Sequence, residues 1–182
     1  MKCMLAGVAA SALVVSAASA DVTVTFENQT WTGFNFTDLT EAFGGFSGTL
    51  TGVSVNATLT ASTAYTYADD LCVYVNPGAL GTGGLLQVGG FSNLSAAERI
   101  FWSNGGSSAP GTTVIDSKTI ATALTFTGTG TDPIIYLGNG YGAAGTSGTW
   151  TGSITLIGVD AVPAPGAIAL LGLAGLAGRR RR

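Results

Sequence analysis

The chain has 182 residues, among them 28 glycines, two cysteines and no histidine, and its formal net charge at pH 7 is −3. Between the two end segments described below, all ten Asp and Glu residues are balanced only by Arg99 and Lys118, so residues 21–161 carry a net charge of −8. This acidic balance argues against nucleic-acid binding, and the absence of histidine excludes Ser-His and Cys-His catalytic systems and imidazole-based zinc sites.

The beginning of the chain has the composition of a secretory signal peptide. Lys2 supplies a positive charge, residues 5–15 are apolar, and the small residues Ala18 and Ala20 precede Asp21. This order predicts a signal helix that signal peptidase removes after Ala20. The apolar stretch is shorter than the roughly 20 residues of a membrane-spanning helix, and a signal anchor is the alternative.

The body of the chain reads as one domain built from short strands. Runs rich in Thr, Val and Ile alternate polar and apolar side chains, which is the period of a half-buried strand, and glycine-rich stretches between them predict turns. The expected strands span residues 21–26, 30–36, 49–60, 65–75, 85–88, 119–127, 134–137 and 149–159. This spacing predicts an all-β fold, a single antiparallel β-sandwich of the jelly-roll type.

Two features of the pattern locate the expected core. Residues 71–75 are apolar on both faces, so this strand is expected in the middle of a sheet with both faces covered. Cys72, within it, is expected to be a small buried hydrophobe, with an intermolecular disulfide as the alternative. Trp31, Trp102 and Trp150 are expected to pack in the core, and stacking on a sugar ring is the alternative for any one of them.

One segment of the body is predicted to form a short helix. Ser95 and Glu98 have the spacing of a capping box, in which the Glu98 side chain reaches back to the backbone amide of Ser95. Residues 99–102 follow and would extend this helix by a turn or two.

Three aspartates are candidates for binding a calcium ion. Asp69, Asp70 and Asp132 flank predicted turns, where carboxylates and loop carbonyls together suit Ca²⁺, and solvated turn carboxylates are the alternative. Paired carboxylates also hydrolyse glycosides, and the candidate pairs are Asp38 with Glu41 or Asp69 with Asp70. Adjacent side chains in a strand point to opposite faces, so Asp69 and Asp70 are not expected to converge if they lie within the strand. The sequence therefore predicts a protein that is not an enzyme and requires no cofactor, with Ca²⁺ as the candidate ion.

The end of the chain is a tail of three parts. A proline-containing break is followed by an uncharged apolar stretch and an arginine cluster: Val162, Pro163, Ala164 and Pro165, then residues 166–178, then Arg179, Arg180, Arg181 and Arg182. Prolines fix φ and disfavour a helix before them, so a short apolar helix is expected to follow the break. That helix would be about 20 Å long, against roughly 30 Å for the hydrocarbon core, which favours a transient hold in the membrane. The arginines are expected to stay on the cytoplasmic side.

The tail resembles the PEP-CTERM sorting signal of proteins that are handled by exosortases, over residues 162–182. The resemblance implies recognition by an exosortase-like membrane enzyme and cleavage near Pro163 and Pro165, in bacteria with an outer membrane and abundant exopolysaccharide. The usual glutamate of the motif is Ala164 here. An ordinary tail anchor is the alternative.

The body is also similar to the jelly-roll P-domain found beside subtilisin-type proteases. Residues 49–55, 67–78 and 148–156 carry this likeness, through an aspartate-leucine strand that leads to a Pro-Gly turn and a closing Gly-Thr-Trp strand. The likeness implies a fold and no activity.

The sequence thus predicts a signal peptide (1–20), a β-sandwich domain (21–161) and a sorting signal (162–182). We expect an exported, non-enzymatic protein that is held briefly at the inner membrane and then reaches the cell surface or the extracellular space, as a component of the envelope or of an exopolysaccharide matrix. The expected partners are signal peptidase, an exosortase-like enzyme and exopolysaccharide. The alternative is a calcium-assisted carbohydrate-binding module that stacks an exposed aromatic ring on a sugar.

Overall fold

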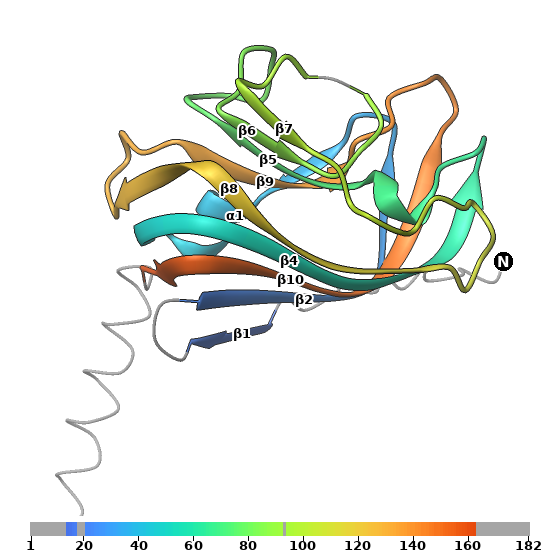
Figure 1. The fold of residues 1–182 in the computed structure, drawn as a ribbon, viewed down its shortest axis with the longest axis horizontal. Coiled ribbons are helices and arrows are strands. Elements are labelled where there is room, and N and C mark those ends of the chain that lie inside the picture. Colours follow the sequence, from blue (N-terminus) through green and yellow to red (C-terminus); the bar gives the residue numbers. More distant parts are fainter. Residues whose placement is uncertain (1–13, 18–20, 93, 163–182) are drawn as a thin grey trace, which may run out of the picture.

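The computed structural model describes residues 14–17, 21–92 and 94–162, and these residues form mainly β-strands. In chain order the elements are β1 (Val14–Ala17), β2 (Asp21–Thr32), β3 (Phe36–Asp38), helix α1 (Leu39–Phe43), β4 (Phe46–Thr63), the 3₁₀ helix η1 (Ala68–Asp70), β5 (Leu71–Asn76), β6 (Leu86–Val88), β7 (Glu98–Ile100), β8 (Thr113–Thr127), β9 (Ile134–Asn139) and β10 (Ser147–Ala161). The strands form two sheets that lie in two layers (Figure 1). The predicted all-β class is confirmed.

The first sheet is antiparallel and has the strand order β1-β2-β10-β4-β8. Val53, Val55 and Leu59 of β4 all point into the core, as their alternate spacing indicates. Leu50 is buried as well, and the pairing of β4 with β8 shifts register between Leu50 and Gly52. The long strands β4, β8 and β10 give this sheet its curved shape (Figure 1).

The second sheet has the strand order β3-β9-β5-β6-β7 and covers the inner face of the first. Its pairs are antiparallel except for β6 and β7, which run parallel. Strand β5 lies in the middle with all six residues buried, so the predicted position of this strand is confirmed. Its inward side chains join the main core, whereas Cys72 and Tyr74 pack with Tyr136 on the outer face, where Leu94 and Ala96 of a long connection help to cover them.

The prediction of a helix after Ser95 is wrong. Glu98 begins strand β7, which pairs in parallel register with β6, and Ser95 has a φ of +62°. The Glu98 carboxylate accepts hydrogen bonds from the backbone amides of Ala121 (2.6 Å) and Thr122 (3.0 Å) on β8. In a capping box, this carboxylate would accept the backbone amide of Ser95. Here it binds amides of β8 instead.

Part of the predicted signal helix is a strand. Residues Val14–Ala17 form β1, which pairs with β2 so that Val14 lies opposite Thr25. The rest of the predicted signal peptide, with Ala18 and Ala20, lies outside the described residues. So does the predicted tail from Pro163 to Arg182, with its apolar helix and arginine cluster. Within the described ranges, no helix is long and apolar enough to cross a membrane.

Candidate ligand-binding site

The three tryptophans lie in the core, and two of them hold the short helix η1. Trp31, Trp102 and Trp150 are each at most 6 % exposed, so core packing is confirmed and stacking on a sugar by these rings is wrong. The indole of Trp150 donates to the Ala68 carbonyl (3.1 Å), and that of Trp102 donates to the Leu71 carbonyl (2.7 Å). These carbonyls stand at the two ends of the turn that carries Asp70. The tryptophans therefore position a site without being exposed in it.

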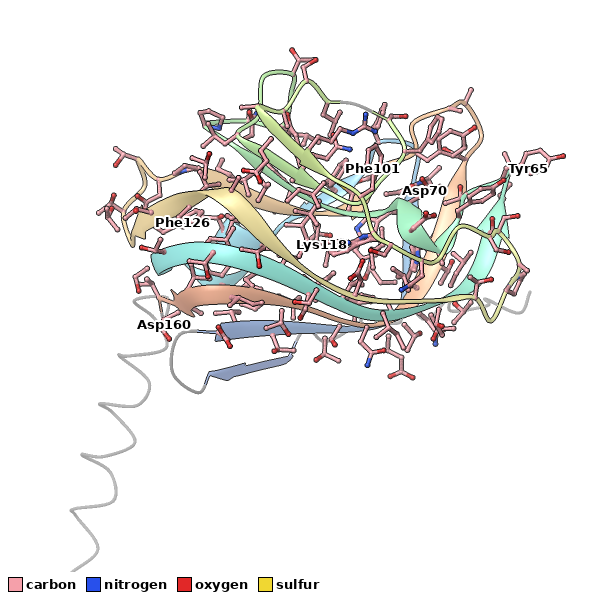
Figure 2. The ribbon with its side chains drawn as sticks, viewed as in Figure 1. Tyr65, Asp70, Phe101, Lys118, Phe126 and Asp160 are labelled. Atoms are coloured by element: carbon pink, nitrogen blue, oxygen red, sulfur yellow. The ribbon has the colours of Figure 1, made fainter. Side chains whose placement is uncertain are left out.

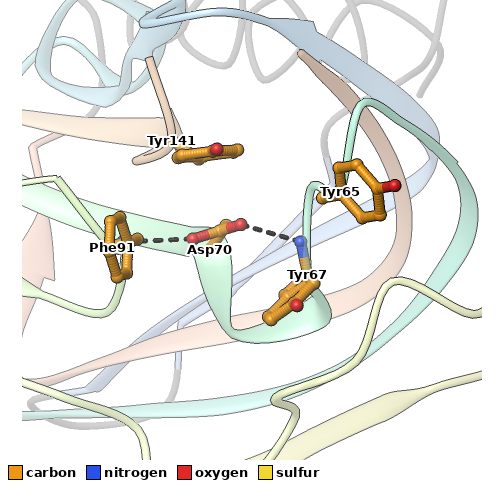
Figure 3. Close-up of a pocket in the computed structure, with 5 residues that line it drawn as sticks. All are labelled: Tyr65, Tyr67, Asp70, Phe91 and Tyr141. Carbon is orange, nitrogen blue, oxygen red and sulfur yellow. Dashed lines mark hydrogen bonds between the residues drawn. The ribbon is translucent and has the colours of Figure 1, made fainter. Parts of the chain in front are cut away.

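Exposed aromatic side chains gather beside this turn, at one end of the molecule. Tyr65, Tyr67, Phe91 and Tyr141 line a pocket of about 160 Å³ together with Asp70 (Figure 3). Tyr65 is 77 % exposed and Phe91 is 71 % exposed, which is unusual for large side chains outside a binding surface. The labelled side chains in Figure 2 place Tyr65 and Asp70 at the end of the molecule opposite to Asp160.

The pocket is assembled from three connections that are distant in the sequence: residues 64–70 after β4, residues 89–92 after β6 and residues 140–146 after β9. The carbonyls of Asp69 and Asp70 accept hydrogen bonds from the amides of Gly90 (2.9 Å) and Gly140 (2.7 Å). The two glycines approach so closely that a Cβ on Gly140 would lie 2.6 Å from the Gly90 Cα.

This backbone contact sets the geometry of the aromatic rings that follow the two glycines. Phe91 and Tyr141 meet edge to face, with ring centroids 5.8 Å apart and an interplanar angle of 88°. This is a favoured arrangement for aromatic pairs, and it orients two walls of the pocket.

Tyr65 is held at the rim by a strained turn. Ala64 and Tyr65 have φ values of +53° and +62°, a left-handed conformation that is rare for residues with bulky side chains. The buried Thr66 fixes the turn, because its hydroxyl donates to the Thr63 carbonyl (3.0 Å) and its own carbonyl accepts from the Ser62 hydroxyl (2.6 Å). Such residues cost on the order of 1–3 kcal/mol each and concentrate at functional sites.

Asp70 lies at the floor of the pocket with only 4 % of its surface exposed. Its carboxylate accepts hydrogen bonds from the backbone amides of Tyr67 (2.7 Å) and Phe91 (3.1 Å). The pKa of Asp70 is raised to about 6, chiefly by burial; the charge of Asp69 contributes to this rise, and the two amide hydrogen bonds oppose it. A carboxylate has about four lone-pair positions, so two remain for a ligand.

The two basic residues of the body bind groups other than the Asp70 carboxylate. Lys118 forms an ion pair with Asp116 at 3.0 Å. The Arg99 guanidinium donates to the carbonyls of Gly90 and Phe91 and lies 4.4 Å from the centre of the Phe101 ring. In the part of the chain that the structure describes, the Asp70 carboxylate therefore has no ion-pair partner.

The predicted calcium ligands are only partly brought together. Asp69 and Asp70 lie on η1 and not in a strand, and both line a second hollow of about 70 Å³. The Asp132 carboxylate instead accepts hydrogen bonds from Thr127 and Thr129 in the turn after β8. Burial of Asp132 acts to raise its pKa, but these hydrogen bonds lower it below the usual range. Among the described residues, no group of three or more acidic or cysteine side chains could hold a metal ion.

Cys72 and Val162, which the sequence also singles out, both lie in the described part of the chain. Cys72 is fully buried, and burial raises the pKa of its thiol, so the residue behaves as the expected core hydrophobe. Val162, the first residue of the predicted sorting motif, donates its amide to the Gly45 carbonyl at 3.0 Å.

The pocket aromatics were missed by the sequence reasoning. Phe91 follows Gly89 and Gly90, and Tyr141 lies between Gly140 and Gly142. A large aromatic residue set among glycines in a loop is the signal that could have found them, because glycine contributes no side chain to bury such a ring.

Comparisons with known proteins add no relative to this picture: no family model matches the chain, and no curated protein or solved structure is similar to it.

Proposed function

We propose that the protein is an exported, non-enzymatic component of the cell envelope or matrix that binds polysaccharide through the aromatic pocket. The observation that carries this proposal is the convergence of Tyr65, Tyr67, Phe91 and Tyr141 around the carboxylate of Asp70. Aromatic faces pack against the C–H face of a sugar ring, and a carboxylate accepts hydrogen bonds from its hydroxyl groups. A pocket with mostly apolar walls and one fixed polar group is the usual form of a small-molecule site.

The proposal that the chain is not a hydrolase is supported by the arrangement of its acidic groups. Glycosidases place two carboxylates on either side of the scissile bond. Here Asp69 and Asp70 are neighbours on a single turn, and Asp70 already accepts two backbone amides.

Export and sorting belong to the same proposal. The signal-peptide composition, the PEP-CTERM-like tail from Val162 to Arg182 and the acidic body support a protein that signal peptidase and an exosortase-like enzyme release to the surface. We also propose that the two sheets form a jelly-roll sandwich related to the P-domain type, which the closing Gly-Thr-Trp strand in β10 supports.

A polysaccharide pull-down and a glycan array test the pocket, using exported protein recovered from cells that express the full chain. We expect the double variant Tyr65→Ala, Phe91→Ala to lose at least about tenfold in affinity, because it removes two exposed aromatic faces at about 1–3 kcal/mol per stacked ring by analogy with base stacking. Ile115→Ala, which removes an exposed apolar side chain on β8, is the matched control and should bind normally.

The same experiment with EDTA separates the proposal from the calcium-assisted alternative. We expect binding to persist in EDTA, since the pocket contacts a sugar through rings and one carboxylate. Binding that EDTA abolishes would support the calcium-assisted module. If no glycan is retained, or if the double variant and the control bind equally, the pocket is not the binding site.

A further inference from the structure

Four aromatic rings and a carboxylate line the pocket, and the Arg99 guanidinium is bound behind one wall, to the carbonyls of Gly90 and Phe91. Tyr65, Tyr67, Phe91 and Tyr141 stand around the Asp70 carboxylate, which lies between them (Figure 3). The face of an aromatic ring carries negative electrostatic potential and attracts a cation. The floor of the same pocket is a carboxylate. The rings and the carboxylate therefore both favour a positively charged ligand.

The electrostatic environment of Asp70 points the same way. The carboxylate is 4 % exposed and has no ion-pair partner among the described residues, so its charge is compensated only by two backbone amides. A buried carboxylate without a cation is unfavourable, and a positively charged ligand group would relieve this cost. The surrounding body, with a net charge of −8, attracts cations and repels anionic sugars such as uronates.

The volume of the pocket and its exposed rim limit the size of the group that can enter and the direction in which a longer ligand continues. About 160 Å³ is room for one small cationic group or part of one sugar ring, and it is well below the volume of a pocket for a large ligand. The strongly exposed rings of Tyr65 and Phe91 form the rim, so a longer chain can continue outward over them.

We infer that this pocket is an aromatic cage for an organic ammonium group, and that the polysaccharide unit it takes is an amino sugar with a free, protonated amine. This inference rests on the proposed function, because it specifies the sugar that the same pocket binds. The ammonium group sits against Asp70 within the rings of Tyr67, Phe91 and Tyr141, and the C–H face of the sugar packs on Tyr65. An N-acetylated sugar lacks the charge and gains nothing from the carboxylate.

Calorimetric titration with two oligosaccharides of equal length tests the inference directly. One probe is a fully deacetylated glucosamine oligomer and the other is its N-acetylated counterpart. We expect the deacetylated oligomer to bind exported, full-chain protein at least about tenfold more tightly, because only its amine forms a charge-assisted contact with Asp70. The preference should fall with Asp70→Asn and remain with Glu41→Gln, which removes the same charge from an exposed position on α1.

A second pair of variants avoids any effect on folding. Tyr65 is largely exposed, so Tyr65→Phe and Tyr65→Leu should both fold, which thermal unfolding verifies. Tyr65→Phe keeps the ring and should bind the deacetylated oligomer more tightly than Tyr65→Leu does. Tyr65→Leu keeps apolar area without a ring and should lose about two- to fivefold.

The outcomes separate this inference from the proposed function. Equal binding of both oligomers, or binding of other glycans alone, overturns the inference and leaves polysaccharide binding in place. Equal losses with Asp70→Asn and Glu41→Gln also overturn it, because they indicate unspecific attraction to an acidic surface. Failure to bind any glycan overturns both proposals.

Discussion

The carboxylate of Asp70 accepts amide hydrogen bonds from Tyr67 and Phe91, so two of the loops that carry pocket rings meet at one side chain. Its backbone carbonyl accepts the amide of Gly140, which brings in the third loop. The side chain that would contact a ligand is thus also a structural link between the walls. For this reason a substitution at Asp70 must be read together with one at the exposed Tyr65, which affects the ligand alone.

The raised pKa of Asp70 gives a prediction on pH. Ligand binding through an ammonium group requires the ionised carboxylate, which is present above a pKa of about 6 and is lost as the pH falls through that value. Because the amines of the oligomer gain protons as the pH falls, a decrease in affinity on acidification reports the carboxylate alone. We expect the affinity to fall by up to about tenfold for each pH unit below 6, in calorimetric titrations from pH 7 to pH 4.5.

The neighbouring charges do not reverse this direction. Asp69, on the same turn, has a pKa that burial also raises, and its protonation weakens cation binding in the same sense. The Arg99 guanidinium is bound to the carbonyls of Gly90 and Phe91 and forms no ion pair with Asp70 among the described residues. Asp70→Asn should flatten the profile. An unmodified protein with a flat profile from pH 7 to pH 4.5 would contradict the role of Asp70.

At the scale of elements, the period-2 alternation of Thr with Val, Ile and Leu was sufficient to predict most strands. The fully apolar run from Leu71 to Val75 also placed β5 correctly. Where the prediction failed, a long-range contact decided the structure: Glu98 bonds Ala121 and Thr122 of β8, which no local spacing reveals. Long-range contacts override local propensity in this way because the buried or paired arrangement has the lower free energy.

The candidate site was less predictable than the fold for the same reason. The sequence singled out Asp69 and Asp70 from their type and their position near a turn. It gave no means to join them with Phe91 and Tyr141, because that depends on the contact of Gly90 with Gly140. Nor could it distinguish buried from exposed aromatics: the tryptophans have the larger rings but lie in the core, whereas Tyr65 and Phe91 are strongly exposed.

The glycine contact between the β6 and β9 connections provides a prediction on pocket assembly. Gly140→Ala would place a Cβ 2.6 Å from the Gly90 Cα and 2.9 Å from the Cys72 Cβ, so the two connections must separate. We expect a loss of about 1–3 kcal/mol in the free energy of unfolding and a weaker affinity for glycans. Gly130→Ala, where a Cβ meets nothing within 4 Å, is the control. Denaturant unfolding that shows equal stability for both variants would mean that the contact is loose.

At the scale of the whole molecule, the proposed processing of the two end segments changes the net charge of the chain. The proposed processing removes the arginine cluster and Lys2, and it converts a chain of net charge −3 into a body of net charge −8. Mass spectrometry of the protein from the cell surface checks this. We expect a mature form that begins at Asp21 and ends near Pro163 to Pro165. A surface-located form that still ends in Arg182 would argue against exosortase-type processing.

The position of strand β1 gives the proposed cleavage after Ala20 a structural consequence. Val14–Ala17 pair with β2 on the side opposite to β10, yet they precede the predicted cut after Ala20. Strand β1 covers the outer edge of β2, and a chain cut at the predicted site after Ala20 would lack this cover. An uncovered edge presents free amides and carbonyls that readily pair with another strand. Removal of the signal peptide would then uncover the edge of β2. This edge, which can pair with other strands, would be exposed only after export and not in the crowded interior of the cell.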